Sequence, residues 1–201
     1  MENNSILVLG NGESRQCLEL SFLMPKYISV GCNAIYREHS VDHLICCDRR
    51  MVLESLKSIK PTTTLYTRND WAKMFKNFPQ VKTVPELPYQ GTSRADNPFH
   101  WGSGAYAVLL ACSLGDDISL AGFDLWSTTG KVNNIYKGTE NYSASDSHPV
   151  DPNYWIYHLS QIFKIFNTKK FKIYNTGDWK LPDEWNFSNV EQKNILTLVS
   201  E

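Results

Sequence analysis

The sequence predicts an α/β fold with one Rossmann-like, doubly wound and mostly parallel sheet and helices on both faces. Short apolar segments without polar alternation recur along the chain, as expected of strands buried on both faces. Segments with helical spacing alternate with them, and the turn Gly10-Asn11-Gly12 separates the first strand from the first helix. This alternation gives a parallel sheet, because each crossover returns the chain to the same edge.

The predicted elements follow one another in a regular order. Strands are predicted at residues 5–9, 27–30, 43–47, 63–67, 81–84, 118–121 and 171–174. Helices are predicted at residues 13–23, 50–59, 70–75, 104–114 and 154–166. Residues 86–101 contain the breakers of a loop, and the long polar segment 122–153 is interpreted as a lid-like loop at the active site. The aromatic tail 179–201 packs down without a clear periodicity.

The composition indicates one soluble domain over residues 1–201. A net charge of -1 gives no electrostatic footprint for nucleic acid or for an anionic membrane. No apolar run approaches the ~20 residues of a membrane-spanning helix, and the polar first residues are unlike a signal peptide. Five cysteines without a Cys-x-x-Cys pair favour neither zinc nor a disulfide framework. We therefore expect a cytoplasmic protein with small, buried thiols.

The turn Gly10-Asn11-Gly12 is placed to bind a phosphate or a ribose. It follows a strand and precedes a helix, where glycine lets the backbone approach an anion. The dinucleotide fingerprint is incomplete, however, because Arg15 stands where its third glycine would fall. The acid expected after the second strand is also missing, and the chain there continues to Asn33. NAD is therefore disfavoured, and a tight turn without any ligand is the alternative.

Polar side chains follow three successive strands of the predicted sheet. Asn11, Asn33 and Asp48 each come directly after a strand, so they are expected at one edge of the sheet. An asparagine carries a donor and an acceptor together, which suits a ribose or a base edge. Each residue alone is typical of a turn. Together they predict a nucleotide-binding rim.

Four short blocks of the sequence resemble a known enzyme family. They are Leu9-Gly-Asn-Gly-Glu-Ser14, Cys32-Asn-Ala-Ile-Tyr36, Gly102-Ser-Gly-Ala-Tyr-Ala107 and Leu120-Ala-Gly-Phe-Asp-Leu-Trp126. In this order they are similar to blocks of the bacterial sialyltransferases of glycosyltransferase family 42. The similarity extends over scattered positions from about residue 6 to residue 174. A weaker resemblance, confined to the N-terminal pattern, links the chain to pyrophosphokinase-like phosphotransferases that act on a pterin alcohol.

The resemblance implies a metal-independent, inverting transfer of a sugar, such as a sialic acid, from a CMP-type donor to a hydroxyl acceptor. No cofactor is expected beyond the nucleotide sugar, which is a substrate, and no metal ligand. The implied donor-binding residues are Gly10, Asn11, Gly12, Asn33, Asp48 and Ser103. Tyr136 and Tyr142 are implied to hydrogen-bond the leaving phosphate, and His148 to act as the general base.

The chemistry of these side chains is compatible with the implied roles. Histidine titrates near neutral pH and can accept the proton of an acceptor hydroxyl. Phenol hydroxyls can donate to a leaving phosphate in place of a metal, and the sequence has no Asp-x-Asp pair. Asp48 departs from the family, which usually has an amide there; a carboxylate repels phosphate but accepts from a ribose or an amino group. An ordinary surface position for His148, and loop anchors for Tyr136 and Tyr142, are the alternatives.

Two other functions are alternatives to the sugar transferase. A phosphotransferase would need Mg²⁺ to bridge nucleotide phosphates, and a non-catalytic nucleotide-binding module would bind without turnover.

His100 and Trp101 precede the helix that contains Ser103 and could border the donor pocket, with Trp101 stacking on a base or a sugar. We favour a packing role for this pair, as a plug at the end of the sheet. The sequence does not predict the acceptor or the oligomeric state.

Overall fold

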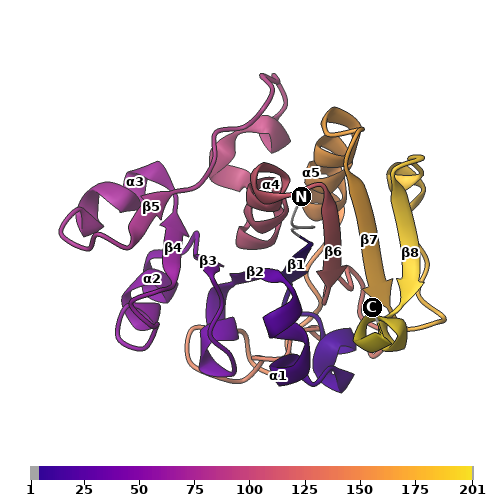
Figure 1. Cartoon of the computed structure of the whole chain (residues 1–201), viewed down its shortest axis with the longest axis horizontal. Helices are drawn as coiled ribbons and strands as arrows, with labels where there is room; N and C mark the ends of the chain where they lie inside the picture. The colour runs from indigo at the N-terminus through magenta and orange to yellow at the C-terminus, as the bar shows by residue number, and fades with distance from the viewer. Residues whose placement is uncertain (1–4, 201) are drawn as a thin grey trace.

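The computed structural model describes residues 5–200 and contains one eight-stranded parallel sheet (Figure 1). The strand order is β5-β4-β3-β2-β1-β6-β7-β8. The strands are β1 (Ile6–Leu9), β2 (Ile28–Cys32), β3 (His43–Ile45), β4 (Thr64–Thr67), β5 (Val81–Thr83), β6 (Asp117–Ala121), β7 (Lys170–Asn175) and β8 (Val190–Asn194). The α/β fold class and the seven predicted strands are confirmed. Residues 1–4 and 201, which the predicted domain includes, lie outside the described residues.

The direction of winding changes at β1, in the middle of the sheet. β1 pairs with β2 on one side and with β6 on the other, both in parallel. From β1 the chain builds outward through β2, β3 and β4 to β5, and it then returns to add β6, β7 and β8 on the opposite side. A crevice forms at such a switch point, because the connections after β1 and β6 leave in opposite directions.

Helices cover both faces of the sheet. They are α1 (Leu20–Leu23), α2 (Arg49–Ser55), α3 (Asn69–Ala72), α4 (Ser103–Leu114) and α5 (Asn153–Ile165). α4 and α5 pack in one core with Ile6 and Val8 of β1, and α1 and α2 share a second core with Leu7 and Leu9. Alternate side chains of one strand thus serve opposite faces, which explains the continuous apolar run in the sequence.

Trp101 belongs to the core beneath α4, as the packing interpretation predicts. Its side chain is 1% exposed, and its ring stacks on His158 of α5 with 4.5 Å between the centroids. His100, the other residue of the pair, is half-buried and contacts Tyr154 at the start of α5 instead. Trp101 therefore packs into the protein and does not present a face to a ligand.

The predicted helix over 13–23 is wrong as one element. The chain forms a 3₁₀ turn at Glu13–Cys17, an extended step at Leu18 and then α1. The amide N–H groups of Glu13 and Ser14 donate to the side chains of Asn133 and Asp124, both distant in sequence. Tertiary partners thus hold the first turn in place, and a continuous helix would have to give up these bonds.

The tail 179–201 contains regular structure that its sequence did not reveal. β8 adds to the edge of the sheet next to β7, and the segment Ile195–Ser200 forms a 3₁₀ turn with Ile195 and Leu198 buried. The sequence of β8, Val-Glu-Gln-Lys-Asn, is mostly polar and lacks the apolar run used to predict the other strands. An edge strand needs only backbone pairing on one side, and charged side chains are common there.

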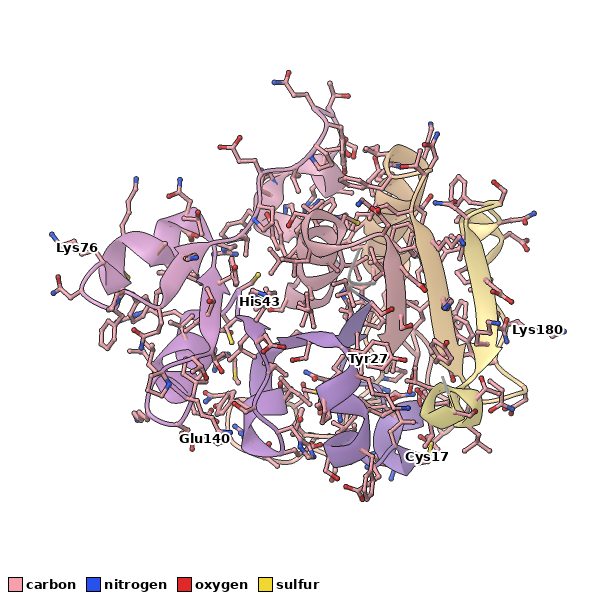
Figure 2. The ribbon with its side chains drawn as sticks, viewed as in Figure 1. Cys17, Tyr27, His43, Lys76, Glu140 and Lys180 are labelled. Atoms are coloured by element: carbon pink, nitrogen blue, oxygen red, sulfur yellow. The ribbon has the colours of Figure 1, made fainter. Side chains whose placement is uncertain are left out.

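Of the predicted long loop 122–153, residues 122–152 contain no α-helix or strand, as predicted, and Asn153 is the first residue of α5. Figure 1 shows it, in salmon, crossing the lower edge of the sheet near α1. Figure 2 places Glu140 of this loop and Cys17 of the first connection at that edge, with Lys76 and Lys180 at opposite ends of the molecule. Among residues 5–200, no helix has the length and apolar character needed to cross a membrane.

Candidate active site

A cavity of about 250 Å³ lies at the switch point of the sheet. Three backbone segments line it: the turn Gly10–Gly12 after β1, residues 102–105 at the start of α4, and residues 122–125 after β6. Cys32 and Asn33, at the end of β2, also line the cavity. The sequence predicts Gly10, Asn11, Gly12 and Asn33 at one edge, and the structure brings them together.

At two glycines that line the cavity, a side chain would collide with a neighbouring residue. A Cβ atom on Gly10 would collide with the carbonyl oxygen of Gly122, and one on Gly12 would overlap the carboxyl group of Asp124. The amide of Gly12 donates to the Gly122 carbonyl at 2.9 Å, which joins the turns after β1 and β6. The turn is therefore kept open to the cavity by the absence of side chains.

The N-terminus of α4 opens into the same cavity. Gly102 caps the helix without a side-chain hydrogen bond to the first turn, so the N–H groups there have no capping oxygen. The Ser103 hydroxyl donates to Asn33 Oδ1 at 2.9 Å and accepts from the Cys47 amide at 3.0 Å. Ser103 thus fixes the Asn33 side chain beside a helix end that attracts anions. Asn33 itself has a positive φ of 53°.

Asn11 is held by a tyrosine of the long loop. Asn11 Nδ2 donates to the hydroxyl oxygen of Tyr142 at 3.2 Å, and the amide of Ala34 donates to the same oxygen at 3.2 Å. Tyr142 therefore ties the turn after β1 to the turn after β2. Burial raises the pKa of the Tyr142 hydroxyl, which keeps it neutral at physiological pH.

A buried arginine stabilises the Gly10–Gly12 turn by a hydrogen bond to a carbonyl of the turn. Arg15 is 2% exposed; its Nε donates to the Gly10 carbonyl at 2.6 Å, and its guanidinium also donates to the Tyr136 hydroxyl at 2.9 Å. Glu38 completes an ion pair with it at 3.2 Å. Arg15 thus occupies the position of the third glycine of the dinucleotide pattern, and its charged side chain hydrogen-bonds the loop itself. Sequence reasoning missed this role, although an arginine so close to a glycine turn was a signal.

Asp124 is the second buried charge beside this turn, and sequence reasoning missed it as well. Its carboxylate accepts from the Ser14 amide at 2.9 Å, from the Ser14 hydroxyl, and from Asn175 Nδ2 at 3.2 Å. Its carbonyl accepts from the Trp179 indole at 2.7 Å. Asp124 therefore joins the β1 turn, the end of β7 and the C-terminal tail. Its position in the block Gly-Phe-Asp at a strand end was the available signal.

The tyrosine pair lies beside the cavity without lining it. Tyr136 is buried, with its hydroxyl bonded to Arg15, and its ring is 5.4 Å from that of Tyr142. Burial raises the pKa of the Tyr136 hydroxyl too. Neither tyrosine is among the residues that line the cavity. In this arrangement the pair supports Asn11 and Arg15, and direct contact with a phosphate stays a prediction.

Like the two tyrosines, Asp48 and His148 are predicted site residues that do not line the cavity. Asp48 caps α2, accepting from the Arg50 amide at 2.8 Å, and its side chain is half exposed. His148 is exposed on the long loop, next to Ser147, whose carbonyl accepts from Val132. Within residues 5–200, no group of three His, Cys, Asp or Glu side chains is arranged to hold a metal ion.

The switch-point cavity and the parallel sheet define a Rossmann-like protein with a candidate ligand site at the carboxyl ends of its strands. The chain is similar to the monofunctional alpha-2,3-sialyltransferase Cst-I from Campylobacter jejuni, with a TM-score of 0.58 and 19% identity. The match covers 94% of this chain and 82% of that chain. This likeness shows the fold.

Two structures of the related sialyltransferase CstII are similar as well. One, from Campylobacter jejuni, is a complex with cytidine-5'-monophosphate; it has a TM-score of 0.54 and 16% identity, over 85% of this chain and 79% of that chain. The other is a complex with a trisaccharide acceptor and CMP, with a TM-score of 0.52 and 17% identity, over 96% and 87%. No family model and no curated protein sequence matches the chain. The structural likeness expected from the short sequence blocks is therefore confirmed at the level of the fold.

Proposed function

We propose that this chain is a glycosyltransferase that moves a sugar from a CMP-type donor to a hydroxyl acceptor, with a sialic acid as the transferred sugar. The observation that carries the proposal is the convergence of Asn11, Asn33 and the Ser103 end of α4 on one cavity. Amide side chains suit a ribose and a base, and a helix N-terminus suits a phosphate. The sialyltransferase fold, seen with CMP in one relative, supports the same donor class.

The leaving phosphate belongs at the N-terminus of α4. As the bond from the sugar to the phosphate oxygen breaks, negative charge grows on CMP, and the N–H groups of the first turn of α4 stabilise it. The Tyr142 hydroxyl, which has its own proton to donate, adds to this stabilisation if the loop shifts it from Asn11 towards the phosphate. These hydrogen-bond donors can stabilise the leaving phosphate without a metal ion, which supports a metal-independent reaction. Activity in the presence of a chelator tests this directly.

His148 is proposed as the general base of an inverting transfer. The acceptor oxygen attacks the anomeric carbon from the face opposite CMP, its proton passes to His148, and CMP leaves with the bonding electron pair. Because His148 lies outside the cavity wall, the reaction requires the loop around it to close over the bound donor. Lid closure of this kind is common in transferases that must exclude water.

Hydrolysis and transfer of CMP-activated sialic acid by the pure protein test the proposal. We expect CMP release in the presence of EDTA, a loss of about 10²-fold or more for His148→Ala, and little change for the control His39→Ala. CMP binding should survive in His148→Ala. A strict need for Mg²⁺ would favour the phosphotransferase instead. Tight CMP binding without any turnover would favour the non-catalytic module.

A further inference from the structure

An ion pair outside the switch-point cavity attaches the long loop to the rest of the fold. Arg37 lies in the 3₁₀ turn Asn33–Arg37 after β2, and Glu54 lies on α2. Arg37 Nε donates to Glu54 Oε1 at 2.7 Å, and both side chains are partly buried. Neither residue lines the switch-point cavity, which we call the donor cavity. The proposed mechanism so far uses neither of them.

Both members of this pair also bond the long loop. Arg37 donates to the Thr139 hydroxyl at 2.7 Å and to the carbonyl oxygen of Glu140, the loop residue labelled in Figure 2, at 3.0 Å. Glu54 accepts from Asn141 Nδ2 at 2.6 Å. Three consecutive loop residues are thus each bonded directly to the pair. We call Arg37 and Glu54 the loop clamp.

The clamped segment forms a turn directly before Tyr142. Asn141 has a positive φ of 65°, a conformation that is uncommon for residues other than glycine. Its side-chain bond to Glu54 supports this conformation. The Tyr142 amide donates to the Thr139 carbonyl at 3.1 Å, which closes the turn. The clamp therefore fixes the backbone from which the Tyr142 side chain reaches Asn11.

The Arg37 guanidinium also lies over the two tyrosine rings. Its central carbon is 5.9 Å from the Tyr136 ring centroid and 5.7 Å from the Tyr142 ring centroid. A cation at this distance is attracted to an aromatic ring, so it favours one placement of each ring. Burial tends to raise the pKa of the Glu54 carboxyl, but the hydrogen bonds that it accepts, led by that from Tyr36, lower it below its usual value. Glu54 is therefore charged at neutral pH and holds Arg37 in place.

We propose that Arg37 and Glu54 are positioning residues for the transfer, because they hold Tyr142 within reach of the leaving phosphate. This inference rests on the proposed function, in which the Tyr142 hydroxyl moves from its present partners towards the phosphate. Because residues 139–141 are clamped, the loop keeps Tyr142 beside the donor site during this move. The clamp thus acts on the departure of CMP and contributes little to the affinity for CMP.

Donor hydrolysis tests the clamp through a double-mutant cycle of Arg37→Gln and Tyr142→Phe. We expect kcat with CMP-activated sialic acid to fall about tenfold in Arg37→Gln and about 10²-fold in Tyr142→Phe, since the first misplaces a donor that the second removes. Because the clamp acts through Tyr142, the double variant should also lose only about 10²-fold. Kd for CMP should change less than about threefold in all three variants. A loss of about 10³-fold in the double variant, the product of the single effects, would overturn the proposal.

Three further variants make this test specific to the clamp. Glu54→Ala should lower kcat about as much as Arg37→Gln, because it removes the other half of the ion pair. Arg37→Lys retains the charge and should recover part of the lost kcat. Arg49→Gln is the matched control, because Arg49 is an exposed arginine at the start of α2 outside the donor cavity, and it should retain the wild-type kcat. Equal losses in Arg49→Gln and Arg37→Gln would contradict a specific role for the clamp.

Hydrogen exchange without any substrate gives a second readout. The Ala34 amide donates to the Tyr142 hydroxyl oxygen, so its protection reports whether the tyrosine is in place. Arg37→Gln should speed exchange at Ala34, as Tyr142→Phe does, and Arg49→Gln should not. Unchanged protection in Arg37→Gln would overturn the positioning role even if activity fell. A wild type that neither binds CMP nor hydrolyses the donor would refute the proposed function and a role in transfer with it, and the exchange measurement distinguishes this outcome from a failed clamp.

Discussion

The two sides of the donor cavity are built in different ways. On the β1 side, the buried Arg15 bonds the Gly10 carbonyl of the Gly10–Gly12 turn, and the buried Asp124 bonds Ser14 just after this turn. At the start of α4, Trp155 lies beside Gly102 and is exposed, and His148 lies outside the cavity wall, exposed on the long loop. Buried ionic networks fix one geometry, whereas exposed side chains can move. In the proposed mechanism, the side of the cavity that binds the nucleotide is therefore preformed, and the side that carries out the transfer is completed when substrates bind.

The largest expected effect is from removing Arg15 on the preformed side. Arg15→Met leaves the Gly10 carbonyl and the Tyr136 hydroxyl buried without their donor. We expect a loss of about 3 kcal/mol in the free energy of unfolding, measured by urea denaturation. Arg50→Met, at an exposed arginine, should stay within about 0.5 kcal/mol of wild type. Equal, small effects for both variants would mean that the buried ion does not fix the turn.

An added methyl group should have opposite effects on stability at two glycines that line the donor cavity. Gly12→Ala forces its Cβ into the Asp124 carboxyl group, so it should cost about 1–3 kcal/mol of stability and weaken CMP binding. Gly104→Ala, where the nearest atom is a Phe123 ring carbon at 3.5 Å, should stabilise α4 by about 0.5–1 kcal/mol. Thermal denaturation with and without CMP checks both. A stable Gly12→Ala protein that binds CMP normally would contradict this account.

Acid should weaken the packing of α5 around Trp101 through His158, whose ring stacks on the Trp101 ring. Its Nε2 donates to the Ala95 carbonyl at 2.8 Å and its ring is buried, so burial lowers its pKa below the usual 6.5. The unfolded chain therefore binds the proton more readily, and stability present above pH 6.5 is lost as pH falls below it, by up to about 1.4 kcal/mol per pH unit. Unfolding curves between pH 8 and 5 measure the slope. His158→Phe should flatten it, and an unchanged slope would remove His158 as its cause.

The smallest effect is expected at Asp48, on the exposed rim. Asp48→Ala removes the cap of α2 and should cost about 1 kcal/mol, whereas Asp48→Ser should keep most of the stability. A role in capping alone leaves CMP affinity unchanged in both variants. A strong loss of CMP affinity in Asp48→Ser with unchanged stability would instead assign Asp48 to the nucleotide, as the sequence resemblance implies. Calorimetric titration with CMP distinguishes the two.

The sequence predicts the sheet well because buried parallel strands leave a strong signal. Apolar runs such as Ile6–Leu9 are required on both faces, and their order around Gly10-Asn11-Gly12 gives the switch point. β8 escaped prediction because an edge strand can be polar. The 13–23 helix was wrong because Ser14 and Glu13 bond to residues more than 100 positions away, which no local pattern contains.

The site was predicted only where its residues follow a strand or begin a helix. Asn11, Asn33 and Ser103 obey that rule, and the structure brings them to one cavity. Arg15 and Asp124 were missed because a charged residue in a sequence is most simply an exposed one, and its burial is evident only once its partners are known.

The binding of CMP tests the central claim, that the cavity between β1 and α4 is a preformed nucleotide site, most directly. The measurement is a calorimetric titration with CMP of three proteins: the wild type, Ser103→Ala and the control variant Arg49→Ala. Ser103→Ala removes the hydroxyl that holds Asn33, so we expect about tenfold weaker binding, or ~1.4 kcal/mol, with wild-type affinity for Arg49→Ala. Absence of CMP binding by the folded wild type, or equal affinity in all variants, would contradict the account.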